Sequence, residues 1–218
     1  MKIHIFCVGG TIDKVYFDAK SKYEVGVPAI SNILHQLDVN FEYTITSLMA
    51  KDSLEMTDDD RSVVAKAVAE CAEDKIIITH GTDTMPETAR SLVDMGTTKT
   101  IILTGALAPA IFKDSDALFN IGGALAAAQS KSSGVFIVMN GYVFDALNVR
   151  KDVENMNFSS RIVTIADNLY SDITSQTVHM QNTLDEFRTF LRPDKKTQAF
   201  SLVSVIDKVL LLVHDELL

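Results

Sequence analysis

The chain has 218 residues, 47% of them hydrophobic and 22% charged, and a formal net charge of −9. This composition supplies enough apolar surface for a folded core, which excludes a disordered chain. The acidic balance disfavours nucleic acid as a partner, because phosphate binding needs concentrated basic charge and the Lys and Arg residues are scattered. No apolar run reaches membrane-spanning length, so we expect no membrane partner.

The cysteines and the amino terminus indicate where the protein works. Cys7 and Cys71 stand far apart in the sequence, with no CxxC or metal-ligand spacing, which predicts two reduced thiols. The Met1-Lys2 start lacks the features of a signal peptide, because the apolar run after it has no cleavage site. The reduced thiols and the missing signal peptide predict a cytoplasmic protein. The histidines are isolated, so we expect no metal site.

Residues 3–8 form an apolar run that predicts a buried strand, and this run ends in Gly9, Gly10 and Thr11. The two glycines allow a sharp turn and a close approach to a ligand, with Thr11 at the sheet edge. Neither the glycine fingerprint of dinucleotide-binding folds nor a phosphate-binding loop is present, so a nucleotide-binding protein is the weakest alternative. Residues 13–26 have no clear periodicity, which predicts a polar loop able to cover a site.

The next elements are a helix over residues 28–37 and a strand over residues 41–47, because their apolar residues follow helical and alternating spacing, respectively. Residues 49–56 then predict a polar loop. Thr57 followed by Asp60 is a capping box that starts the second helix.

A second apolar run, over residues 76–79, ends abruptly in polar groups. It predicts a buried parallel strand that leads into a helix. Thr84 and Glu87 match another capping box, which leaves residues 81–83 in the turn. Such a turn also has an explanation without function, because Thr and Asp cap helices and Gly accepts positive φ.

Two more strands, over residues 100–104 and 134–139, flank a helix that runs from Asp114 or Ser115 to about Gln129. Strand and helix therefore alternate along the chain. This pattern predicts an α/β fold, with helices on both faces of a parallel sheet in a Rossmann-like or flavodoxin-like three-layer arrangement.

We expect a single main domain over residues 1–160 and a C-terminal extension over residues 161–218, packed on the same domain or at a dimer interface. An edge strand over residues 158–166 and a short helix capped by Thr183 are predicted near and within this extension. Residues 200–218 are apolar, but their spacing does not separate strand from helix.

Parallel strands present the turns at their carboxyl ends side by side, so we expect Thr11 to meet Thr82 and Asp83 in one crevice. A Thr hydroxyl becomes nucleophilic when a neighbour takes its proton, and a desolvated Lys is such a neighbour. Lys151 is the candidate, with Asp83 holding it in position. For Lys151 the alternative is an ordinary solvated side chain. His80 could act as a base, but it ends a buried strand and has no carboxylate partner in its motif, so we expect a structural role for it.

Four motifs resemble the bacterial-type L-asparaginase family, namely residues 9–12 (GGTI), 80–85 (HGTDTM), 104–106 (TGA) and 138–140 (VMN), with Lys151 after them. The resemblance covers about residues 1–158. It implies a threonine acyl-enzyme that hydrolyses the side-chain amide of L-asparagine, or of a similar small amide, to carboxylate and ammonia. It also implies that no metal or organic cofactor takes part.

The resemblance further implies catalytic roles for five residues. Thr11 matches the nucleophile, which lies on a mobile loop in the family, and Tyr23 matches the tyrosine that assists it. Thr82, Asp83 and Lys151 match a second, rigid triad.

Substrate-binding residues follow from the same motifs. Ser53 matches the residue that holds the substrate's α-carboxylate, and Asp83 would bind the α-ammonium group. Fixing both charged ends orients the amide for attack. Backbone amides near Thr82 and Ala106 are expected to stabilise the oxyanion. The predicted substrate-binding residues are Gly10, Asp52, Ser53, Leu54, Gly81 and Ala106.

The sequence departs from the family in its length and at Leu54, where many relatives have a polar residue. Family members usually carry a smaller second domain that donates groups to a neighbouring subunit's site, and 218 residues are too few to include it. The resemblance therefore implies a short form that acts on a small amino-acid substrate as a homodimer or higher homo-oligomer. Two alternatives remain: a non-catalytic amino-acid-binding or regulatory module, and an amidase subunit that delivers ammonia to a partner.

Overall fold

The computed structural model describes residues 1–17, 22–152, 154–160, 178 and 181–182. The chain divides into two compact units, Met1–Ala166 and Asp167–Leu218. All the elements described below belong to the first unit. The predicted helix that begins at Thr183, the apolar segment 200–218 and residues 161–166 of the predicted edge strand lie outside the described residues.

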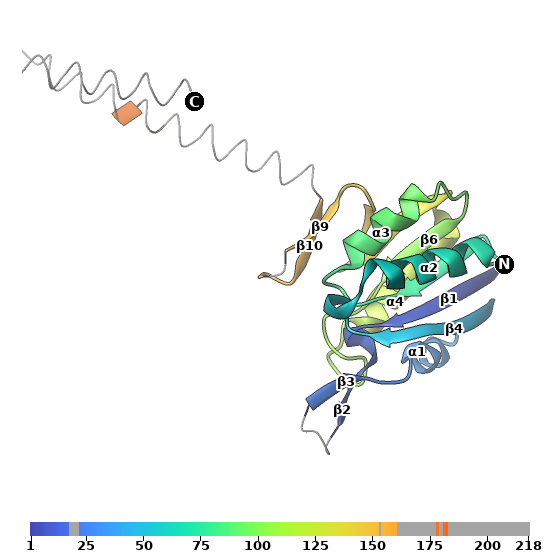
Figure 1. Ribbon diagram of the computed structural model, residues 1–218. Helices are drawn as coiled ribbons and strands as arrows, with labels where there is room; N and C mark the ends of the chain where they lie inside the picture. The colour runs from blue at the N-terminus through green and yellow to red at the C-terminus, as the bar shows by residue number, and fades with distance from the viewer. Residues whose placement is uncertain (18–21, 153, 161–177, 179–180, 183–218) are drawn as a thin grey trace, which may run out of the picture. The chain divides into compact units, whose positions relative to one another are not determined.

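A six-stranded sheet forms the centre of the first unit (Figure 1). Its spatial order is β4 (Glu42–Lys51), β1 (Lys2–Gly9), β5 (Lys75–Thr79), β6 (Thr100–Thr104), β7 (Gly134–Met139) and β8 (Tyr142–Asp145). The first five strands are parallel, whereas β8 runs antiparallel to β7. The chain passes from β1 to β4 on one side and then to β5 on the other, so the strand order reverses between β1 and β5. Open sheets of this flavodoxin-like order bind ligands at that switch point.

Four helices cover the two faces of the sheet, as the alternating pattern predicts. Side chains of α2 (Asp58–Glu70) and α3 (Met85–Asp94) pack on one face, and those of α1 (Ile30–Gln36) and α4 (Ala117–Ser130) pack on the other (Figure 1). The predicted α/β fold is therefore confirmed. No helix in the described parts of the chain combines the length and the apolar character needed to cross a membrane.

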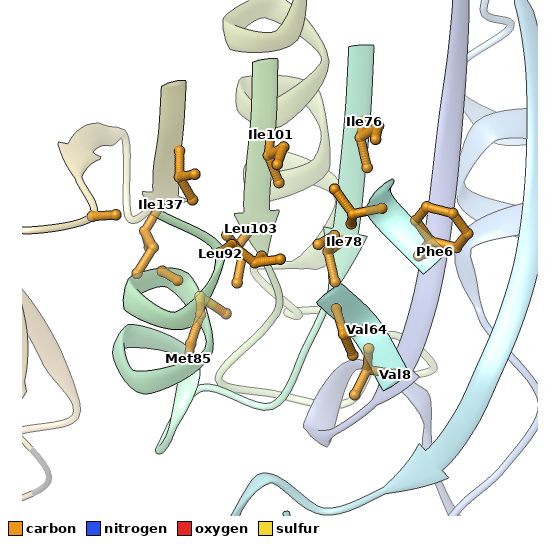
Figure 2. Close-up of a cluster of buried hydrophobic side chains, with 14 of the residues drawn as sticks. Phe6, Val8, Val64, Ile76, Ile78, Met85, Leu92, Ile101, Leu103 and Ile137 are labelled. Carbon is orange, nitrogen blue, oxygen red and sulfur yellow. The ribbon is translucent and has the colours of Figure 1, made fainter. Parts of the chain in front are cut away.

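Each buried strand contributes side chains to the hydrophobic clusters on both faces of the sheet, because successive side chains of a strand point to opposite faces. Ile76 and Ile78 of β5 join the cluster under α2 and α3, which also includes Val64 and Met85 (Figure 2). Ile77, between them, joins the cluster under α1 and α4. Each fully buried side chain of this size contributes roughly 1.5–3 kcal/mol. Burial on both faces explains why this strand is continuously apolar.

The two predicted capping boxes have different outcomes. At α2, the Asp60 amide donates to the Thr57 hydroxyl at 3.3 Å and the Thr57 amide donates to the Asp60 carboxylate at 2.8 Å, which confirms the box. The box predicted at Thr84 is wrong, because this residue precedes α3 without a side-chain cap. Its hydroxyl instead donates to the Ser53 carbonyl at 2.7 Å. A tertiary contact has replaced the local one.

Three segments differ from their predicted form. The expected loop over residues 13–26 contains an antiparallel hairpin, β2 (Lys14–Phe17) and β3 (Lys22–Val25). Strand β4 continues to Lys51, beyond the predicted end at residue 47, because it stays paired with β1 as far as Gly9. Near the end of the first unit, β9 (Val149–Asp152) and β10 (Asn157–Ser160) form a separate two-stranded sheet.

Candidate active site

Three turns at the carboxyl ends of β1, β4 and β5 touch through Gly10, Ser53 and Gly81. A Cβ added to Gly10 would lie 2.3 Å from the Gly81 Cα, and a Cβ added to Gly81 would lie 2.6 Å from the Ser53 Cβ. Both glycines are therefore required by close approach of the backbone. This contact brings the predicted Gly10, Ser53 and Gly81 into one place and sets the turn before Thr11 against the turn before Thr82.

Thr11 begins the short 3-10 turn η1 (Thr11–Asp13), which follows β1 directly. The Asp13 amide donates to the Gly10 carbonyl at 3.1 Å, and the Ala110 amide donates to the Ile12 carbonyl at 3.1 Å. The side chain of Ile12 is buried, whereas Thr11 is partly exposed. Among the described residues, no side chain hydrogen-bonds the Thr11 hydroxyl, so this group is held by its backbone and remains available to a ligand.

Lys151 reaches the end of β5 from β9. Its Nζ lies 2.6 Å from the Thr82 Oγ1 and also contacts the Asp83 carboxylate. The Lys151 side chain is only 4% exposed, against 27% for Asp83. Burial of an ammonium group is costly unless it is paired, so Asp83 accounts for the position of this charge. The predicted group of Thr82, Asp83 and Lys151 is thus assembled.

The turn after β4 is tied to the same place. The Ser53 hydroxyl accepts a bond from the Asp83 amide at 3.2 Å, and the Ser53 carbonyl accepts the bond from Thr84. Asp52 accepts a bond from the Leu54 amide at 3.2 Å and pairs with Lys14 at 2.6 Å. The Leu54 side chain itself is exposed, so only its backbone takes part in these contacts.

Charge around Asp52 favours its ionised form. Partial burial by itself raises the pKa of this carboxyl. The bond from Lys14, the bond from the Leu54 amide and the charge of Lys151 outweigh this effect, so the pKa of Asp52 lies below its ordinary value. Lys14 belongs to the segment that carries Thr11, and its ion pair with Asp52 links that segment to the Ser53 turn.

His80 lies behind the turn and is fully buried. Its Nδ1 is 2.6 Å from the Gly81 carbonyl, and its Nε2 is 2.9 Å from the Thr88 hydroxyl. A carbonyl only accepts, so Nδ1 carries the proton and Nε2 accepts from Thr88. Burial lowers the pKa of His80 to about 4, although the hydrogen bond that His80 donates to the Gly81 carbonyl opposes this shift. His80 is a neutral support for Gly81, in line with the structural alternative.

Two further predicted residues sit at the edges of this arrangement. Ala106 is buried and follows Gly105, whose added Cβ would lie 2.3 Å from the His80 carbonyl, so the turn after β6 packs on that after β5. Tyr23 is half exposed on β3, and its ring packs edge-on against Tyr16 at 5.4 Å and Phe112 at 6.0 Å. No hydrogen bond in the described structure joins Tyr23 to Thr11.

One cluster of metal-ligand types occurs elsewhere. Ligand atoms of His4, Cys71 and Glu73 lie within 4.8 Å of one another, and they gather at the start of β1 rather than at Thr11. Glu73 is already hydrogen-bonded to His4 at 3.2 Å and to the Cys71 thiol at 3.3 Å, and it pairs with Lys2 at 2.7 Å. Glu73 thus binds the imidazole of His4, the thiol of Cys71 and the ammonium group of Lys2.

The sequence gives little indication of Asp13, Lys14 and Thr84 as parts of this site. Lys14 shows no signal beyond its place after the Thr11 motif, and Thr84 matches a helix cap that does not form. Asp13 is a carboxylate that directly follows the apolar Ile12 in the Thr11 turn. Its importance becomes clear only from the structure, which shows that its side chain is buried.

Comparisons with known proteins identify the family of this chain. The family described as "Asparaginase, N-terminal" matches residues 2–184. L-asparaginase 2 of Escherichia coli (strain K12) is 34% identical over 159 residues, which cover 68% of this chain and 46% of that protein. L-asparaginase I from Vibrio cholerae O1 biovar eltor superposes with a TM-score of 0.65 at 28% identity, covering 73% of this chain and 51% of the other.

The thermostable L-asparaginase from Thermococcus kodakarensis superposes with a TM-score of 0.64 at 26% identity, again over 73% of this chain and 51% of the other. This chain thus spans about half the length of the relatives it matches. The match begins at residue 2 and includes β1, β5 and β9, which carry or lead into Thr11, Thr82 and Lys151. The chain belongs to the asparaginase family, through the amino-terminal domain of that family.

Proposed function

We propose that this protein is an asparaginase-type amidohydrolase, which hydrolyses the side-chain amide of L-asparagine or of a similar small amide to a carboxylate and ammonia. The observation that supports it most directly is the buried Lys151 ammonium beside the Thr82 hydroxyl and the Asp83 carboxylate. A buried lysine paired with a hydroxyl at a sheet switch point is an arrangement suited to proton transfer.

Thr11 is the proposed nucleophile. Its hydroxyl oxygen forms a bond to the amide carbon, the C–N bond breaks, and ammonia leaves after it takes up a proton. The product is an ester between Thr11 and the acyl group, which water then cleaves to release the carboxylic acid. Tyr23 is proposed to assist by taking the Thr11 proton while its own phenolic proton passes to the departing nitrogen, which requires β3 to bring its hydroxyl to the reacting atoms. Backbone amides near Thr82 and Ala106 are proposed to stabilise the oxyanion.

Thr82, Asp83 and Lys151 are proposed to handle the second proton transfer. When the Lys151 proton moves to Asp83, a neutral amine remains 2.6 Å from the Thr82 hydroxyl. That amine can take the hydroxyl proton, and Thr82 can in turn take a proton from the water that attacks the ester. The protein supplies each of these groups from its own side chains, so the proposal includes no metal or organic cofactor.

The proposed substrate is a small amino acid bound by its two charged ends. Ser53 and its backbone would hold the α-carboxylate, while Asp83 would bind the α-ammonium group. Gly10 and Gly81 are proposed to present their backbone beside these groups, because the close packing of the turns leaves no room for a side chain on either residue. Asp52 and Leu54 complete the turn through the bond between them. We further propose a cytoplasmic homo-oligomer with no nucleic-acid or membrane partner.

Ammonia release from L-Asn, L-Gln, D-Asn and simple aliphatic amides tests this function. Thr11→Val and Thr82→Val remove one hydroxyl each at almost constant volume, and each is expected to lower the rate about 10²–10⁴-fold. Thr100→Val is the matched control, because this buried Thr lies at the amino end of β6, away from the Thr11 turn. Activity in wild type that both site variants retain would exclude the proposed mechanism.

The binding-module alternative predicts a different result from the same proteins. Calorimetry would then show saturable binding of L-Asp or L-Asn with no ammonia from any amide. The ammonia-delivery alternative predicts release only in a stable complex with a second protein.

A further inference from the structure

Asp13 is a buried carboxylate two residues after Thr11. Its side chain is 3% exposed, and Oδ1 accepts a hydrogen bond from the Ala29 amide at 2.7 Å. Oδ2 is buried and has no hydrogen-bond partner among the described residues. No role has been assigned to this residue above. Its geometry is unusual, because buried carboxylates in folded proteins are normally paired or fully hydrogen-bonded.

The ionised Asp13 carboxylate lowers the stability of the fold, because it is buried. Burial raises the pKa of its carboxyl to about 6, against a smaller opposing effect of the Ala29 bond. Near neutral pH the fold therefore holds an unpaired negative charge in its interior. Residues that lower stability in this way are concentrated at functional sites. Asp13 stands beside the proposed nucleophile, so a role in holding Thr11 accounts for the cost.

Three hydrogen bonds join Asp13, in the Thr11 turn, to the segments before and after that turn. The Asp13 amide donates to the Gly10 carbonyl at 3.1 Å, which closes the turn around Thr11. The Asp13 carbonyl accepts from the Gly26 amide at 2.8 Å, which closes the base of the β2–β3 hairpin. The carboxylate holds Ala29, the residue before α1, so this one side chain connects the Thr11 turn to the next helix.

Among the residues that the structure describes, no ion pair neutralises Asp13. On β1 the buried Cys7 faces it, and burial, aided by the Asp13 charge, raises the pKa of this thiol to about 11, so Cys7 is neutral. On β2 the adjacent Lys14 is turned to Asp52 at 2.6 Å. On β3 the ionisable residues are Lys22, Tyr23 and Glu24, and on α1 the ionisable residue is His35 in the last turn.

We propose that Asp13 is a positioning residue, whose ionised carboxylate fixes the backbone of the Thr11 turn through Ala29 and thereby sets the attack geometry of the nucleophile. A charge-assisted hydrogen bond is about twice as strong as a neutral one. Protonation at Oδ2 therefore weakens the hold on Ala29 and loosens Thr11. This inference rests on the proposed function for its catalytic consequence, although the positioning itself can be measured without any catalysis.

The test compares Asp13→Asn and Asp13→Ala with wild type in two measurements. Asn keeps an acceptor for Ala29 but has no charge, whereas Ala has neither. For ammonia release, Asp13→Ala is expected to lower kcat about 10- to 100-fold with KM changed less than about three-fold, and Asn is expected to fall between. The wild-type rate should decline below a pH of about 6, and the Asp13→Asn variant should not show this decline.

The second measurement is the NMR shift of the Thr11 methyl group against pH, with the buried Thr104 methyl as internal reference. Wild type is expected to show an inflection near pH 6 that Asp13→Asn lacks. Equal profiles in both proteins, or a kcat in Asp13→Ala within two-fold of wild type, would overturn the inference. If wild type releases no ammonia from any amide, the proposed function fails, and the NMR comparison still decides the positioning role.

Discussion

A methyl group on Gly10 would lie 2.3 Å from the Cα of Gly81, so the turns that lead to Thr11 and Thr82 are in backbone contact. No other residue type fits at this distance without moving one turn. Gly10 also has a φ of +97°, which L side chains rarely adopt.

Gly10→Ala is therefore expected to separate the two turns and to reduce ammonia release at least about 100-fold. Gly96→Ala is the matched control, since Gly96 has a φ of +65° but open space around its Cβ position. It should lose roughly 1 kcal/mol of stability through the same backbone strain while keeping its activity. Rate assays and thermal denaturation of both variants check this, and equal activity in the two would show that the contact is not required.

Lys151→Met should remove the proton-transfer group and lower kcat about 10²–10⁴-fold. Lys151→Arg should not restore it, because a guanidinium stays protonated and its planar fork does not fit the place of an ammonium. Lys75→Met is the control, because Lys75 also donates to a threonine hydroxyl, that of Thr100 at 3.0 Å, but at the amino end of the sheet. Steady-state kinetics of the three proteins decide the question. A Lys75 variant as impaired as the Lys151 variant would point to stability rather than chemistry.

The two threonines that match capping boxes should respond differently to loss of the hydroxyl. Thr57→Val removes a formed cap and is expected to lower the free energy of unfolding of the chain by about 1 kcal/mol, with KM unchanged. Thr84→Val removes the bond to the Ser53 carbonyl instead, so it should raise KM for the amide by releasing the Ser53 turn. Urea denaturation and kinetics measured side by side separate these effects. A reversed pattern would contradict both assignments.

The buried, neutral His80 predicts a loss of stability in acid. Its pKa is about 4 in the folded chain, below the ordinary value of 6.5, so between these values the unfolded chain binds more protons. The free energy of unfolding should therefore decrease as the pH falls from about 6.5 to 4, by on the order of 3 kcal/mol from this residue. His80→Asn should show a flatter profile over that window in urea titrations.

Asp13 acts in the opposite direction over a similar range. Its folded pKa of about 6 lies above the ordinary 3.8, so its contribution to the free energy of unfolding increases as the pH falls from about 6 to 4. The double variant of His80→Asn with Asp13→Asn separates the two contributions. If the single His80 variant has the same pH profile as wild type, His80 is not the group that titrates.

Local patterns in the sequence determined the fold class and the ends of several strands. Strands β6 and β7 begin and end where their apolar runs do, because burial on both faces requires an uninterrupted run. The capping box at Thr57 was equally local, since both its hydrogen bonds lie within one helical turn. From these elements the sequence also predicted that Thr11 and Thr82 follow neighbouring parallel strands.

Only the tertiary structure decided how these pieces meet. The family resemblance indicated that Lys151 belongs with Thr82, but the structure shows the contact itself, across 69 residues, and brings Ser53 to Asp83 across 30. The Thr84 hydroxyl donates to the Ser53 carbonyl instead of capping its helix, and the Asp13 side chain is buried although its segment was predicted to be a polar loop. Periodicity encodes which face of an element is buried, but it does not encode which distant side chain fills the space beside it. That choice depends on packing between elements, where a contact such as Gly10 against Gly81 leaves room for no side chain at all.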